Sequence, residues 1–159
     1  MLVLAEYLFM FSLEQAMDNI WFNTPNIDSM NQQMANTACS NLGIKITQIG
    51  PDYVVGTMPA DERTFQPIGL VHGGANVLLA ETLGSMAANL CLDTTKEYAV
   101  GQEINANHLR GVRSGTVTGM AKMIHKGRTS QIWEIRLVDD QEKLSCISRL
   151  TMAVIQVPK

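Results

Sequence analysis

Residues 66–85 hold the side chains that could attack and polarise a carbonyl group. His72, Gly73 and Gly74 stand where an apolar loop gives way to a helical pattern. The first turn of a helix leaves backbone N–H groups unpaired and carries the positive end of the helix dipole. Glycines there allow another group to approach the backbone closely. The N–H groups of this turn therefore suit the oxyanion that develops when a carbonyl is attacked.

Glu81 lies two turns further along the same helical pattern, among apolar neighbours. A carboxylate in such surroundings is unfavourable unless it is paired or used in chemistry. Ser85 and Asn89 follow Glu81 at helical spacing, which places all three on one polar face. Oxyanion donors and one carboxylate, acting as base or nucleophile, are the minimum set for hydrolysing an activated acyl group. These residues alone leave a second interpretation open. In it, Glu81 is a solvated side chain and the glycines only allow close packing.

A single long helix must hold these groups in place, and the pattern predicts it over residues 73–92. The expected buried stripe at helical spacing consists of Leu79, Leu83, Met86, Ala87 and Leu90. Small residues are frequent along the same stretch, so the helix can lie very close to a sheet. From residue 98 the period changes to two, which predicts strands over residues 98–107, 115–125, 129–138 and 144–155.

Shorter elements are expected before the long helix. They are helices over residues 1–24 and 27–41 and strands over residues 44–49 and 53–58. Asp28 or Ser29 could cap the second helix and Gly43 could end it. A Gly-Pro-Asp turn joins the two strands. One long antiparallel sheet wrapped around the central helix, in a single α+β domain, is the packing that this order favours.

The composition excludes several classes of protein. Hydrophobic residues make up 46% of the 159-residue chain and charged residues 17%, as in ordinary globular proteins. The formal net charge of −3 leaves no basic surplus for binding nucleic acid, although 9 of the 12 Lys and Arg residues come after residue 107. No apolar run approaches the ~20 residues that a membrane span needs. Three scattered cysteines predict neither a disulfide framework nor a metal site, and they fit a cytoplasmic protein.

Four stretches of the chain carry a resemblance to a known family. They are MPADERTFQPIGLVHGGANVLLAETLGSMA, VGQEINANHLR, VRSGTVTG and SRLTMAV. Together they resemble the hotdog-fold thioesterases of the phenylacetate-degradation type, and most closely the hydrolases of 1,4-dihydroxy-2-naphthoyl-CoA and the proofreading thioesterases of enterobactin synthesis. The resemblance extends over about residues 20–155. It implies one hotdog domain over residues 20–159, after an N-terminal extension of residues 1–19 that the family core does not need.

The resemblance also implies roles for individual residues. Glu81 corresponds to the family's catalytic carboxylate, which acts as nucleophile or as general base for water. Gly73 corresponds to the glycine whose N–H holds the thioester oxygen, while Gln66 and His72 correspond to residues that orient the thioester. Ser85 corresponds to a helper on the central helix. In this family the site straddles a dimer interface, so Glu81 is expected to face Gln66 and His72 of the neighbouring chain, in a homodimer that assembles to a homotetramer.

The residues expected to bind coenzyme A fall in the basic half of the chain. They are His108, Arg110, His125, Lys126, Gly127, Arg128 and Thr129. Residues 126–128 could cradle phosphate by themselves, as a tight turn with two cations, or could be a plain hairpin turn. His108 could equally be a structural histidine. The acyl pocket is expected around Met86 and the loop with Phe65, Gln66 and Ile68.

The expected substrate is therefore an acyl-CoA, with an aromatic or hydroxyaryl acyl group, or an acyl-carrier-protein thioester. No metal and no cofactor are expected, because coenzyme A is part of the substrate. Two other functions stay open: a hotdog hydratase or dehydratase, and a non-catalytic acyl-CoA-binding protein. The chain shows no Asp-x4-His motif of the hydratase type, and a non-catalytic binder is expected to lack the carboxylate of Glu81.

Overall fold

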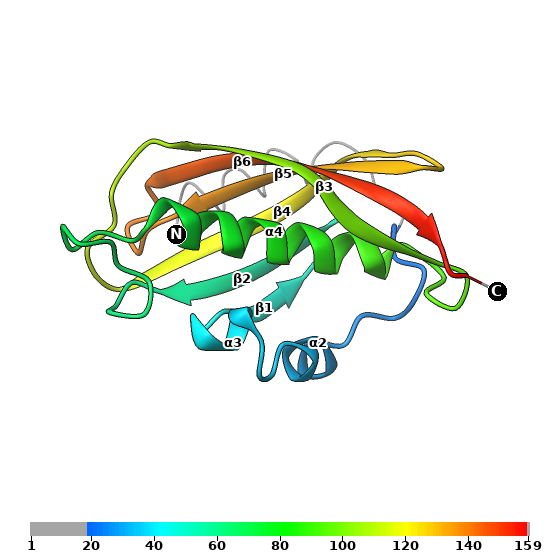
Figure 1. The fold of residues 1–159 in the computed structure, drawn as a ribbon, viewed down its shortest axis with the longest axis horizontal. Helices are drawn as coiled ribbons and strands as arrows, with labels where there is room; N and C mark the ends of the chain where they lie inside the picture. The colour runs from blue at the N-terminus through cyan, green and yellow to red at the C-terminus, as the bar shows by residue number, and fades with distance from the viewer. Residues whose placement is uncertain (1–18, 159) are drawn as a thin grey trace.

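The computed structural model describes residues 19–158 as one curved sheet around one long helix. The helices are α2 (Ile27–Gln33), α3 (Ala38–Asn41) and α4 (Gly73–Leu90). The strands are β1 (Lys45–Ile49), β2 (Tyr53–Pro59), β3 (Glu97–His108), β4 (Thr116–Lys126), β5 (Ser130–Val138) and β6 (Leu144–Gln156). Figure 1 shows α4 lying lengthwise along the sheet, with α2 and α3 beside β1. The expected α+β hotdog architecture is confirmed.

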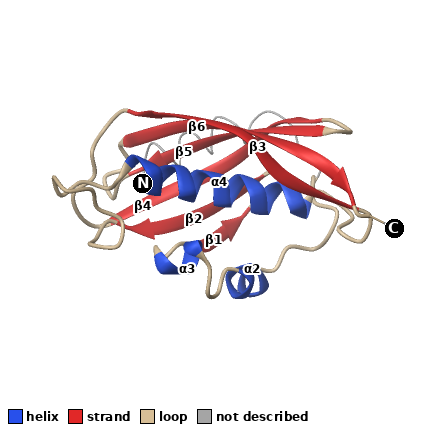
Figure 2. Cartoon of the chain, viewed as in Figure 1, coloured by secondary structure: helices blue, strands red, loops and turns tan. Residues whose placement is uncertain are grey.

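All neighbouring strands of the sheet run antiparallel. The six strands follow the order β1-β2-β4-β5-β6-β3, so β1 and β3 form the two edges. Figure 2 shows the strands as a single layer that curls around α4. The pairing of β3 with β6 shifts register between Gly101 and Glu103, where β3 has one extra residue. A bulge of this kind bends a strand locally and re-aims its side chains.

The core lies between α4 and the concave face of the sheet. Leu79, Leu83 and Ala87 have no exposed surface, whereas Met86 and Leu90 are only half-buried. The predicted buried stripe is therefore confirmed at Leu79, Leu83 and Ala87. At Met86 and Leu90 it reaches only the margin of the core. Small residues bring the helix close to the strands, as a Cβ on Gly84 would stand 2.5 Å from Cδ2 of Leu150.

The prediction of one helix over residues 27–41 is wrong. Two short helices occupy this segment, and between them Asn36 takes a left-handed conformation with a φ of 59°. Thr37 then caps α3 in a capping box, while Asn26 caps α2 in place of Asp28 or Ser29. Cap side chains on both sides of the break stabilise two helix starts where the apolar pattern alone favours one.

Two further expectations concern the start of the chain. Residues 19–24 are not helical, which corrects the end of the helix expected over residues 1–24. The rest of that helix, and nearly all of the expected N-terminal extension, lie outside the described residues.

Within residues 19–158, no helix is both long enough and apolar enough to cross a membrane. The same residues contain no group of three or more His, Cys, Asp and Glu side chains arranged to hold a metal ion.

Candidate active site

The N-terminus of α4 offers one free backbone donor. His72 is the N-cap, and its Nδ1 accepts a hydrogen bond of 2.8 Å from the N–H of Gly74. The N–H groups of Ala75 and Asn76 both donate to the carbonyl of His72. Among residues 19–158 the N–H of Gly73 has no acceptor. A free N–H at the positive end of an eighteen-residue helix is the donor that a developing oxyanion needs.

A pocket opens beside that free N–H. It has a volume of about 260 Å³ and is lined by Gln66, Leu70, Val71, Gly73, Asn76, His108, Leu109, Arg110 and Gly111. A tight turn shapes one wall, because the N–H of Gln66 donates to Leu70 over 2.7 Å and Gly69 takes a φ of 73°. The imidazole of His108 shapes another, since a Cβ on Gly73 would lie only 2.8 Å from its Nε2. The expected partners Gly73, Gln66 and His108 therefore meet in one place.

Asn76 is a member of this pocket that sequence reasoning missed. The residue is 4% exposed, and its Oδ1 is buried with no hydrogen-bond partner among the described residues. Leaving a buried acceptor unpaired costs roughly 1–3 kcal/mol. The sequence does contain a signal for this residue, because Asn76 places an amide three residues after Gly73 on a helix face that is otherwise apolar.

Glu81 lies elsewhere on α4, against the edge strand β3. A Cβ on Gly101 would collide with Oε1 of Glu81, so the carboxylate lies directly beside the backbone at the β3 bulge. Asn89 follows the same line, because its amide bonds both the N–H and the carbonyl of Ala99, at 2.9 and 3.0 Å. Ser85 contacts the sulfur of Met152, at 3.7 Å, across from Gly101. The polar face predicted for α4 is thus confirmed, and it faces β3.

One chain does not bring Glu81 and the free N–H of Gly73 together. Eight residues separate Gly73 from Glu81, which is about 12 Å along a helix axis. The pocket beside Gly73 does not include Glu81. Since β3 is the edge of the sheet, the carboxylate of Glu81 lies at the rim of the subunit.

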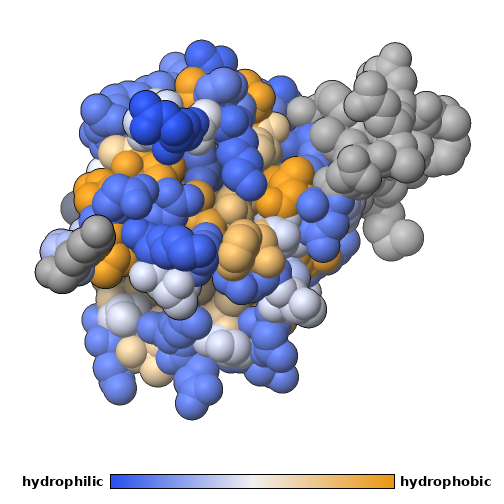
Figure 3. Space-filling model, turned by 90° about the vertical axis from the view of Figure 1, so that its right-hand side faces the viewer, coloured by the Kyte–Doolittle hydropathy of each residue, from blue (hydrophilic) through white to orange (hydrophobic). Residues whose placement is uncertain are grey.

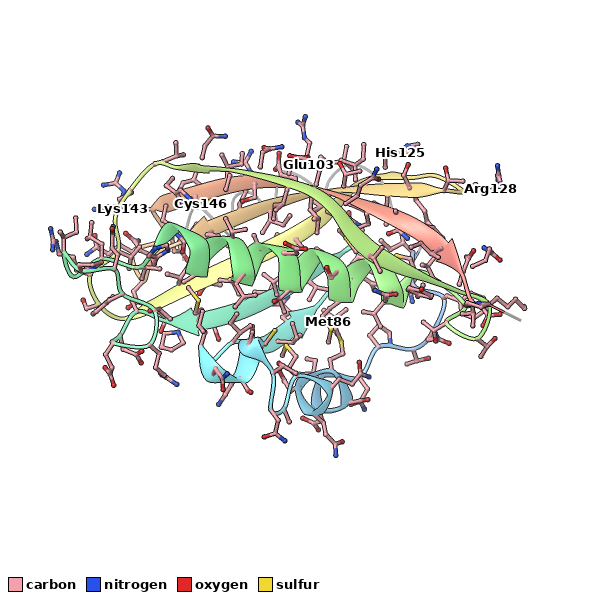
Figure 4. The ribbon with its side chains drawn as sticks, in the orientation of Figure 1. Met86, Glu103, His125, Arg128, Lys143 and Cys146 are labelled. Atoms are coloured by element: carbon pink, nitrogen blue, oxygen red, sulfur yellow. The ribbon has the colours of Figure 1, made fainter. Side chains whose placement is uncertain are left out.

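The expected CoA-binding residues lie at two ends of the molecule. His108 and Arg110 lie beside the β5–β6 turn, because the N–H groups of Leu109 and Arg110 both donate to Ser145. Arg128 lies in the β4–β5 turn, at the other end of β5, about 26 Å away along the strand. Figure 4 shows this separation, with Arg128 at one end and Lys143, in the β5–β6 turn, at the other.

The β4–β5 turn is a tight hairpin. The N–H of Gly127 donates to Ser130 over 2.8 Å, and His125 packs against Gly127, whose Cβ would stand 3.0 Å from Nε2 of the histidine. Arg128 and Thr129 are exposed, and Lys126 reaches the carbonyl of Ile20 over 3.5 Å. Figure 3 views this end of the molecule and shows hydrophilic atoms over most of it, with small apolar groups between them.

Met86 lines a different pocket from Gln66. This second pocket, of about 240 Å³, lies between α2 and the C-terminal half of α4, and its other lining residues include Met30, Gln33 and Leu90. Figure 4 shows Met86 projecting from α4 toward α2. Within one chain the two parts of the expected acyl pocket are therefore apart, and Ile68 is 68% exposed.

Two of the cysteines, Cys91 and Cys146, do not offer a nucleophile. All three are free thiols, and burial raises the pKa of Cys91 to about 11, against a smaller opposite effect of the Lys126 charge. Burial also raises the pKa of Cys146. A thiol acts as a nucleophile only as thiolate, so these two side chains stay inert near neutral pH.

Comparison with known proteins identifies the family of this chain. A thioesterase superfamily profile matches residues 68–146. The 1,4-dihydroxy-2-naphthoyl-CoA hydrolase of Escherichia coli is 43% identical over 136 residues, which cover 86% of this chain and 99% of that protein. The chain belongs to the thioesterase superfamily. The proofreading thioesterase EntH of Cronobacter turicensis is a further superfamily relative, 46% identical over 86% of this chain and 98% of its own length.

Solved structures of superfamily members share the fold. A mutant of the thioesterase PA1618 from Pseudomonas aeruginosa superposes with a TM-score of 0.86 at 51% identity, over 87% of this chain and 99% of that one. The thioesterase HI1161 from Haemophilus influenzae gives a TM-score of 0.85 at 48% identity, over 88% and 97%. The predicted resemblance is confirmed, and the protein is a thioester hydrolase.

Proposed function

We propose that this thioesterase hydrolyses an aryl- or hydroxyaryl-CoA ester at a site shared by two subunits. The observation that carries the proposal is the free N–H of Gly73 in a pocket that lacks a carboxylate, while Glu81 stands at the edge strand of the same chain. A second subunit joined along β3 would present its own Glu81 to this pocket. The site would then hold an oxyanion donor from one chain and a base or nucleophile from the other.

The reaction follows from these groups. The thioester oxygen accepts hydrogen bonds from the N–H of Gly73 and from the side-chain amide of Gln66, which lines the same pocket. Glu81 removes a proton from water, whose oxygen bonds to the carbonyl carbon as the C–S bond breaks and the thiol leaves with that proton. Direct attack by Glu81, followed by hydrolysis of the anhydride, gives the same products. Neither route requires a metal or a cofactor.

His72 and Ser85 have supporting roles in the proposal. Because Nδ1 of His72 accepts from Gly74, the proton of the neutral imidazole is on Nε2, which can donate to the substrate. Ser85 lies one turn beyond Glu81 on the polar face and can hold the attacking water or the acyl group.

The shared site also accounts for the division of the basic residues. An antiparallel junction along β3 places the β4–β5 turn of one subunit near the His108 end of its partner. Lys126 and Arg128 would then meet His108 and Arg110 across the interface and enclose the phosphates of coenzyme A. An acyl-carrier-protein ester would place its thioester in the same site and would make fewer contacts with these basic residues.

We expect Arg128→Ala to raise KM for a CoA ester before it lowers kcat. Phosphate contacts are distant from the reacting carbonyl and contribute equally to the ground and transition states. Steady-state kinetics with one aryl-CoA measure both constants. Arg149→Ala is the matched control, because Arg149 is exposed on β6 next to Leu150, whose side chain faces α4. A fall in kcat with KM unchanged would contradict a phosphate role for Arg128.

The substrate class is tested by thiol release from a panel of esters. The panel compares benzoyl-CoA and hydroxybenzoyl-CoA with acetyl-CoA and palmitoyl-CoA. We expect aryl esters to have a kcat/KM at least about tenfold higher, roughly 1.4 kcal/mol of transition-state discrimination. A preference for palmitoyl-CoA would remove the aromatic assignment and leave the thioesterase assignment standing.

A further inference from the structure

We propose that Asn76 determines acyl specificity by accepting a hydrogen bond from a hydroxyl group of the substrate. The inference rests on the proposed aryl-CoA hydrolysis and adds a residue and a chemical requirement to it. The pocket at the N-terminus of α4 contains one buried polar side chain, Asn76, and its Oδ1 has no donor among the described residues.

The position of Asn76 fits the acyl side of the thioester. It follows Gly73 by three residues, about 4.5 Å along the helix axis. A carbonyl oxygen held by the N–H of Gly73 would therefore place its acyl substituent within reach of the Asn76 amide. One aromatic ring spans the separation between the thioester carbonyl and Asn76. A hydroxyl on that ring, rather than the end of a long acyl chain, would therefore contact the Asn76 amide.

The chemistry of the unpaired atom selects the partner. An amide oxygen can only accept, so its partner must be a donor. A hydroxyl donates, whereas a fluorine or a bare C–H at the same ring position does not. No surrounding side chain of the described residues bonds to this oxygen: Leu70 and Val71 are apolar, and the donors of Gln66, His108 and Arg110 in the same pocket do not reach it. A substrate without the hydroxyl would leave this acceptor buried and unpaired, which is how such sites reject close analogues.

The test compares hydroxyl and fluorine at each ring position of benzoyl-CoA, in the wild-type protein and in Asn76→Leu. Leu keeps the size of the side chain and removes the acceptor. We expect wild-type kcat/KM to favour one hydroxy isomer over its fluoro counterpart by at least about tenfold, and Asn76→Leu to reduce that ratio to about one. The rate of each variant with unsubstituted benzoyl-CoA is the reference for its hydroxy-to-fluoro ratio, so that a general loss of activity is separated from a loss of the hydroxyl preference.

Two further measurements show whether the effect of Asn76→Leu comes from the lost acceptor or from damage to the fold. Asn76→Asp keeps an acceptor near the positive end of α4 and should retain the preference for the hydroxy ester. The melting temperature of Asn76→Leu should not fall, because the substitution removes an unpaired polar atom from the interior.

The outcomes separate the two proposals. If wild-type protein hydrolyses aryl-CoA without a hydroxyl preference, or if Asn76→Leu keeps the preference, the assignment of Asn76 is wrong and the proposed function stands. An equal loss with all esters would mean that Asn76 acts on the common pantetheine arm or through a bound water, and would also overturn it. Absence of aryl-CoA hydrolysis by the wild-type protein would reject the proposed function, and the role of Asn76 with it.

Discussion

Glu81→Ala is expected to lower kcat by ~10²–10⁴ or more while the protein stays folded, because in the proposed reaction it removes the general base or nucleophile. The side chain is half-buried beside Gly101, and no hydrogen bond within residues 19–158 depends on it. Steady-state thiol release from the best aryl-CoA measures the loss, and thermal unfolding measures the integrity of the fold.

A matched control distinguishes loss of chemistry from loss of charge. Glu62→Ala removes the same group from an exposed loop position, and it should leave kcat unchanged. If Glu81→Ala kept more than about a tenth of the wild-type kcat, Glu81 would have no essential role in the chemical step.

Mixing two inactive variants should restore activity. In a symmetric dimer of Glu81→Ala and Gln66→Ala chains, one site carries both substitutions and the other carries neither. Equal mixing makes half of the dimers mixed, so activity should reach about a quarter of the wild-type value per chain. The measurement is thiol release after subunit exchange, with the exchange followed by mass spectrometry of chains with different tags.

The control for this experiment replaces the Gln66→Ala chain with a chain that carries both substitutions. No intact site can then form, and the mixture should stay inactive. Activity in the first mixture that does not rise above that of the separate variants, after verified exchange, would mean that Glu81 and Gln66 of one chain act together.

The positions of the free N–H of Gly73 and of the Glu81 carboxylate were predictable from the residues. A glycine pair at the start of a helical pattern fixes where the free N–H groups lie, and helical spacing fixes that Glu81, Ser85 and Asn89 share a face. Both expectations concern one helix, where a fixed period relates sequence to geometry. The structure adds that this face lies against β3, which depends on the order of strands in the sheet.

Other features depended on contacts that sequence spacing does not encode. The break between α2 and α3 comes from cap side chains at Asn26 and Thr37, in a segment without glycine or proline. The buried amide of Asn76 lines a pocket formed by separate segments of the chain, which sequence spacing does not relate to one another. The segments around His108 and Arg128 are both basic but distant in space. His108 pairs with Cys146 near the start of β6, whereas Arg128 lies just before Ser130, which pairs with Ala153 toward the other end of β6.

The central claim is that a thioester lies between Gly73 of one subunit and Glu81 of its partner. A crystal structure of Glu81→Gln with an unhydrolysed hydroxybenzoyl-CoA tests it directly, because the substitution keeps the shape of the side chain and removes the base. We expect the thioester oxygen about 2.7–3.1 Å from the N–H of Gly73, with the substituted side chain of the opposite subunit next to the carbonyl carbon. A thioester bound in the pocket between α2 and α4, or one whose carbonyl meets both groups from a single chain, would contradict the account.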